Sequence, residues 1–196
     1  MAQNLNHLPH INNVKAGANK YDPVHKAIFE VYFTLPNALR HVDNIAQDEA
    51  ILTEQVVSVS GLDALQKTTA AGEQKFFGVT VSYLNPTVDT TSAEISMVLN
   101  MNLRNVTDNY VLKIFRAWEN LSYDLSTGIR GIKSDYISDN LRVAEATRNG
   151  EIWRSYIFHN VMLTAVTGLE DLDYSSNDAR QLNVTFRADW WEDEIA

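Results

Sequence analysis

The sequence predicts a mainly β fold: an antiparallel twisted β-barrel or sandwich of about seven strands, flanked by one α-helix. Stretches in which apolar and polar residues alternate recur along the chain, as in strands with one buried face. Only one stretch shows the 3.6-residue apolar period of an amphipathic helix. The elements follow in the order β-β-β-β-α-β-β-β, without the βαβ alternation that indicates a parallel sheet.

The chain has 196 residues, which is enough for one domain with a sizeable core. Residues 1–24 show no sustained period and carry several Asn, Gly and Ala, so we expect an extended N-terminal arm there. Residues 25–196 are then expected to form a single β-barrel domain.

Four strands are predicted before the helix, over Ala27–Leu35, Ile51–Leu62, Phe76–Leu84 and Ala93–Leu103. Between the second and third strands, Ala64–Lys75 is small, polar and without a period, which predicts a long inter-strand loop. After the third strand, Asn85-Pro86 is expected to turn the chain.

The predicted helix carries a stripe of large apolar residues at helical spacing. Thr107 is its expected N-cap residue. The stripe consists of Val111, Ile114, Phe115, Trp118 and Leu121.

Three strands are predicted after the helix. Tyr136–Thr147 and Glu151–Thr167 are joined by Arg148-Asn149-Gly150, in which Asn-Gly favours a tight hairpin turn. The long strand Glu151–Thr167 is apolar on both faces, so both faces need cover. The helix or an opposing sheet could cover one face, and a neighbouring subunit could cover the other. The closing strand, Leu182–Glu192, alternates almost without exception. Its expected buried face holds Leu182, Val184, Phe186, Ala188 and Trp190.

Composition and charge argue against thiol chemistry, phosphate binding and metal binding. The chain has no cysteine, and its net charge is −9, without a cluster of Lys and Arg that could grip phosphates. Much of the acidic excess falls after Glu170. The five His residues lack metal-binding spacing, and no phosphate loop or nucleophile elbow occurs. We therefore predict no catalytic residue, no cofactor and no metal site.

No run of 18 apolar residues exists, so no membrane-spanning segment is predicted. The first residues lack the basic start and apolar stretch of a secretory signal.

The second half of the chain resembles the tail tube proteins of contractile-tailed bacteriophages. The resemblance rests on a helix containing Ala117-Trp118, then the strand Asn140–Val143, then the hairpin and long strand Trp153–Val166. It ends with a closing strand read as Val184-Thr185-Phe186-Arg187-Ala188-Asp189-Trp190-Trp191-Glu192. The opening strand at Phe29-Glu30-Val31 also fits, whereas the arm and the segment Leu62–Ser92 are longer than the family pattern.

This resemblance implies a structural protein of the virion tail, assembled in the host cytoplasm. Its copies would form hexameric rings that stack into a tube, inside a tail sheath and around a tape measure protein, starting from baseplate or initiator proteins. Genome DNA would pass through without sequence-specific binding, and an acidic bore would repel its phosphates.

Two sets of residues are predicted to serve the tube. The expected self-assembly interface consists of Leu65, Phe76, Phe77, Trp153, Trp190 and Trp191. The expected acidic residues of the bore or surface are Asp171, Asp173, Asp189 and Glu192.

Three rival readings remain open. The first is the inner tube or tube initiator of a related contractile injection or secretion system, which shares the fold. The second is a monomeric ligand-binding β-barrel, which predicts a pocket and no rings. The third is an enzyme, which predicts a convergent polar cleft.

Overall fold

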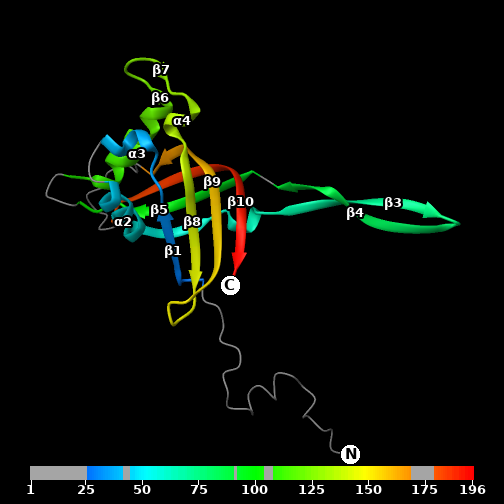
Figure 1. The fold of residues 1–196 in the computed structure, drawn as a ribbon. Coiled ribbons are helices and arrows are strands. Elements are labelled where there is room, and N and C mark those ends of the chain that lie inside the picture. The colour runs from blue at the N-terminus through cyan, green and yellow to red at the C-terminus, as the bar shows by residue number, and fades with distance from the viewer. Residues whose placement is uncertain (1–25, 42–44, 91, 104–107, 169–178) are drawn as a thin grey trace, which may run out of the picture.

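The computed structural model describes residues 26–41, 45–90, 92–103, 108–168 and 179–196, so the predicted arm over residues 1–24 lies outside the described residues. A six-stranded antiparallel sheet, in the order β1-β8-β9-β10-β5-β2, curls into a nearly closed barrel (Figure 1). Its strands are β1 (Phe29–Phe33), β2 (Val56–Ser60), β5 (Ala93–Asn100), β8 (Ser138–Ala146), β9 (Ile152–Thr167) and β10 (Gln181–Ile195). The mainly β, barrel-like fold class is confirmed.

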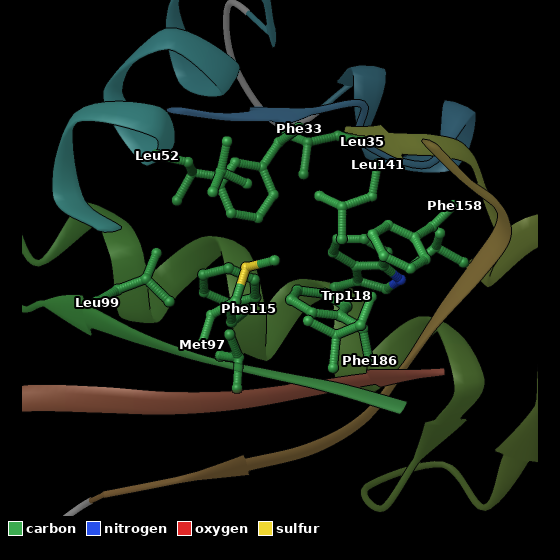
Figure 2. Packing of buried hydrophobic residues seen from close by; sticks show 14 of the residues in the cluster. Phe33, Leu35, Leu52, Met97, Leu99, Phe115, Trp118, Leu141, Phe158 and Phe186 are labelled. Carbon is green, nitrogen blue, oxygen red and sulfur yellow. The ribbon is translucent and has the colours of Figure 1, made fainter. Parts of the chain in front are cut away.

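The inner face of this sheet closes over helix α3 (Tyr110–Ser122). Figure 2 shows aromatic rings from the sheet and the helix meeting in one cluster. Phe186 of β10 lies with its ring centroid 6.1 Å from that of Phe115 and 5.5 Å from that of Trp118. Phe33 of β1 packs edge-on against Phe115 at 6.4 Å. Each such side chain contributes roughly 1.5–3 kcal/mol when fully buried, so this cluster holds helix and sheet together.

The predicted helix stripe is confirmed, because its first four members are buried. The predicted N-cap is wrong. Asn109 caps the helix instead, and its Oδ1 accepts a hydrogen bond from the backbone N–H of Leu112 at 3.1 Å. Asn109 is a strong capping residue, and it stands immediately before the first helical residue, Tyr110.

More helix is present than the single flanking helix that was predicted. Helix α2 (Ile45–Gln55) covers the first part of the predicted strand Ile51–Leu62, and only Val56–Ser60 is a strand. The helix buries Leu52 in the core, and Glu49 Oε1 accepts a hydrogen bond from the Leu35 N–H at 2.9 Å. The chain up to Gln55 is rich in Ala, Gln and Glu, which favour a helix. Short helical segments complete the described helices: η2 (Asn37–His41), η3 (Leu62–Ala64) and α4 (Lys133–Tyr136).

The predicted long loop over Ala64–Lys75 is also wrong, because most of it is a strand. β3 (Lys67–Phe76) pairs with β4 (Val79–Thr90) in a hairpin that projects from the barrel (Figure 1). Asn85-Pro86 does not end the strand. It lies in a bulge, between the pairs Thr69–Val88 and Ala71–Leu84, where Pro needs no ladder hydrogen bond. A second, short hairpin pairs β6 (Tyr123–Asp124) with β7 (Ile129–Arg130).

A bend in β9 and β10 reverses which side chains face the core. Asn160 in β9 has a φ of 55°, and its neighbours Phe158 and Val161 are both buried although they lie three residues apart. On the paired strand, Trp190 is exposed and Trp191 is buried. The prediction that Trp190 continues the buried face of β10 is therefore wrong, because regular alternation stops at this bend.

No helix of the described residues is long and apolar enough to cross a membrane.

Candidate self-assembly surfaces

The β3–β4 hairpin ends in a two-residue turn formed by Phe77 and Gly78. Phe76 pairs with Val79, and the turn residues between them have φ angles of 48° and 85°. Positive φ at both positions is the requirement of a type I′ turn, the turn that matches the twist of a hairpin. The turn holds the Phe77 side chain fully in solvent, with a relative exposure of 107%.

The two faces of the hairpin differ in character. Near the tip, one face carries the large apolar side chains and the other carries the charged and hydroxyl side chains. Further from the tip, the exposed Leu84 lies on this second face, opposite Ala71. The apolar face consists of Phe76, Val79, Val81 and Tyr83, all exposed. The polar face consists of Glu73, Lys75, Thr80 and Ser82. No described element of the chain covers the apolar face, so the outer half of the hairpin presents an unburied apolar stripe about 15 Å long, at about 3.4 Å per residue.

Among the predicted interface residues, the structure brings together only Phe76 and Phe77. Leu65 is half-buried against the core, just after η3, and Trp191 is buried within the barrel. Trp153 is half-buried at the bulge in β9, and its Nε1 has no hydrogen-bond partner among the described residues.

Trp190 lies on the outer face of the sheet, where its ring stacks on that of His159. The two centroids are 3.7 Å apart and the planes are inclined by 10°. On the same face, two and three strands away from Trp190, the Arg142 guanidinium of β8 lies 5.9 Å from the ring of Tyr32 of β1, whose exposure is 39%. The Tyr32 hydroxyl donates to Glu30 at 2.6 Å, and this hydrogen bond raises the pKa of the phenol. This patch combines Trp, Tyr and Arg, the side chains that dominate protein interfaces.

The predicted acidic residues are dispersed. Asp189 accepts an ion-paired hydrogen bond from Lys133 Nζ at 2.6 Å, which lowers the pKa of the carboxyl group. Glu192 lies on the exposed side of β10, with its Oε2 3.8 Å from His159 Nε2. Asp171 and Asp173 lie outside the described residues.

A groove of about 640 Å³ lies between β1 and β2, the two edge strands of the barrel. Its apolar lining comes from Ile28, Phe29, Val57, Val59, Leu62 and Val143. The sequence analysis missed this groove, because its walls come from three separate segments, residues 26–29, 57–63 and 143–145, and no local pattern links them.

A second exposed apolar region lies at the β6–β7 hairpin, where Leu125 is 85% exposed and Ile129 is 66% exposed. A smaller groove of about 340 Å³ lies beside it, between α3 and β9. Within the described ranges, no three His, Asp or Glu side chains lie close enough to hold a metal ion.

Comparison with known proteins finds similar folds among solved structures. No protein-family model matches the sequence, and no curated protein matches it. A solved structure of the PVC sheath–tube complex, an extracellular contractile injection system in its extended state, contains a similar chain. It has a TM-score of 0.53 and 16% identity over 89% of this chain and 93% of that chain.

Two further structures agree. The tube-terminating cap of the anti-feeding prophage gives a TM-score of 0.53 and 17% identity, over 90% of this chain and 93% of that chain. The PVC sheath/tube terminator gives 0.51 and 16%, over 90% of this chain and 99% of that chain. The chain therefore shares its fold with proteins of contractile tube machines, as the resemblance predicted.

Proposed function

We propose that this chain is a structural protein that assembles with copies of itself into hexameric rings, which stack to form the hollow inner tube of a contractile machine. The observation that carries the proposal is the β3–β4 hairpin, whose apolar face and Phe77 are left in solvent by the single chain. A soluble protein seldom exposes a contiguous apolar surface of this kind unless another molecule covers it.

The fold comparisons support one kind of contractile machine over the other. The matched structures are a sheath–tube complex, a tube cap and a sheath/tube terminator of extracellular injection systems. We therefore favour an injection-system tube over the phage tail tube that conducts a genome. In either machine the partners are the surrounding sheath and the cap, terminator or baseplate proteins at the tube ends.

The outer sheet patch around Trp190 is the proposed contact between neighbours within a ring. Trp190 is 43% exposed, and Tyr32 and Arg142 on the same face of the sheet provide further side chains that typically anchor interfaces. If a second copy packs against this patch, it also covers the half-exposed outer face of the long strand β9.

The net charge of −9 supports a tube whose bore repels polyanions. Of the acids proposed for it, Asp189 is held by Lys133 and its charge is partly neutralised, whereas Glu192 is exposed beside His159 and Trp190. Replacing Glu192 with Gln separates its two possible places. More retention of a DNA probe by tubes that still assemble supports the bore, whereas loss of ring assembly assigns Glu192 to the contact around Trp190, and no change in either contradicts both.

The proposal is tested by light scattering coupled to size-exclusion chromatography over a range of concentrations. The expected result is a population with the mass of six chains, or larger species in multiples of that mass. A mass of 22.1 kDa at every concentration contradicts self-assembly by the isolated chain. Binding of a small apolar ligand by that monomer would instead support the ligand-binding barrel.

A further inference from the structure

We propose that the hairpin tip of one copy inserts Phe77 into the groove between β1 and β2 of a second copy. This inference rests on the proposed function and deepens it, because it names the surface that receives the hairpin. Four observations support it. They are the conformation of Phe77, the lining of the groove, the charges around the hairpin tip and the groove, and the distance between the tip and the groove of the same chain.

The backbone conformation of Phe77 and the exposure of its ring are both energetically unfavourable, and the folding of the hairpin explains neither. Its φ of 48° is an outlier for a bulky side chain, and its ring is fully exposed to water. Asn, Asp or Gly at this position of a type I′ turn would avoid both costs. Backbone strain of this kind collects at functional sites, where the strained residue is held for contact with a partner.

The groove is large enough to take an aromatic side chain, and much of its lining is apolar. Its volume of about 640 Å³ falls within the range of about 300–1,000 Å³ that is typical of sites for small ligands. Its walls include Val57, which is 43% exposed and loses that exposure if the groove is filled. A buried aromatic ring in such a pocket is the common form of an interface hot spot.

Charges around the two surfaces are complementary. Asp63 and Glu145 line the groove together with one cation, Lys26, so its rim has an acidic excess. Lys75 is the charged residue nearest the hairpin tip, two residues before Phe77, and Glu73 lies two residues further from the tip on the same face. Opposite charges at the rim of an interface favour the correct encounter and orientation.

The groove cannot be filled by the hairpin of the same chain. Leu62 and Asp63 line the groove, and β3 begins only four residues later, at Lys67. The straight hairpin then carries its tip about 30 Å away from this root, at about 3.4 Å per residue (Figure 1). The contact must therefore join two copies, with different surfaces of each.

A contact between two different surfaces repeats from copy to copy. Each chain offers a tip to one neighbour and a groove to another, so the contact can build a stack of rings. A subunit at the end of a tube needs either the hairpin tip or the groove, but not both. This chain has both surfaces.

The first test replaces Phe77 with Asn, which removes the ring while fitting the turn better. The Phe77→Asn chain is expected to keep its melting temperature as a monomer and to need a concentration about tenfold or more higher for assembly. The control, Phe77→Tyr, keeps the ring and is expected to assemble as the original chain does. Assembly of Phe77→Asn at the original concentration overturns the role of Phe77.

The second test uses the absence of cysteine, which makes any engineered disulfide unambiguous. A size-tagged Phe77→Cys chain is mixed with an untagged Val57→Cys chain under mild oxidation. The expected result is a covalent dimer of intermediate size. The control is the same tagged chain with Leu125→Cys, an exposed position on the β6–β7 hairpin, which is expected to cross-link far more slowly.

The outcomes separate this inference from the proposed function. If the original chain assembles but both mixtures cross-link equally slowly, the groove is the wrong surface and the proposed function stands. If the original chain remains a monomer at all concentrations and no cross-link forms, both the inference and self-assembly are overturned.

Discussion

The ring of Tyr83 lies across the backbone of Gly72, its cross-strand partner in the β3–β4 hairpin. A β-carbon added to Gly72 would lie 2.6 Å from Cζ of Tyr83, closer than real contacts allow. An aromatic side chain that covers a facing glycine is a known way of stabilising a strand pair. The pair therefore sets the position of Tyr83 on the apolar face of the hairpin.

Replacing Gly72 with Val should displace Tyr83 and weaken assembly, because the branched side chain occupies the place of the ring. The melting temperature of the monomer should stay the same, since neither residue belongs to the barrel core. Sedimentation velocity measures the assembly and calorimetry measures the melting temperature.

The matched control for Gly72→Val is Ala71→Val, which adds the same branched side chain to the other face of β3. It should assemble normally. If both variants assemble equally well, the apolar face of the hairpin is not part of the interface.

Helix α3 should depend on its cap. Changing Asn109 to Ala removes the acceptor of the Leu112 N–H and is expected to cost about 1 kcal/mol of the free energy of unfolding. Asn109→Asp keeps an acceptor and should cost much less. Urea denaturation of the monomer checks both. Equal losses from Ala and Asp would show that the side-chain hydrogen bond is not what stabilises the helix.

The ion pair between Asp189 and Lys133 should make a small, pH-dependent contribution to stability. The hydrogen bond from Lys133 lowers the pKa of Asp189 below its ordinary value of 3.8. The contribution is therefore present above that value and is lost as the pH falls through the lower pKa of the folded state. Because both side chains are partly exposed, it should not exceed about 1 kcal/mol.

Asp189→Asn should accordingly be less stable than the original chain at neutral pH, and equally stable in strong acid. Urea denaturation at both pH values measures the difference. A loss of the same size in strong acid would mean that the substitution acts through packing and not through charge.

The elements that the sequence predicts well are those whose burial is regular. The stripe from Val111 to Trp118 and the alternation from Leu182 to Ala188 each face a single core, so their periods are visible in the sequence. The hairpin before β9 was likewise predictable. Its turn is not the type I′ turn that Asn-Gly favours, because Gly150 has a positive φ of 82° but Asn149 does not.

The elements that it predicts poorly lack this regularity. Strand β3 has no apolar alternation because most of its residues face solvent, and only pairing with β4 makes it a strand. The helix before β2 is short and contributes mainly Leu52 to the core among its described side chains, so it shows no wide apolar stripe. Consecutive tryptophans at positions 190 and 191 could be assigned to faces only after the bend at Asn160 was known.

Electron microscopy of the purified chain, with two-dimensional averaging of the particles, tests the central claim most directly. The account predicts six-fold rings with a central hole and, at higher concentration, stacks of such rings in which the hairpin of one ring reaches the next. Uniform particles of a single chain at every concentration, also after addition of tube-end proteins from a contractile machine, would contradict it.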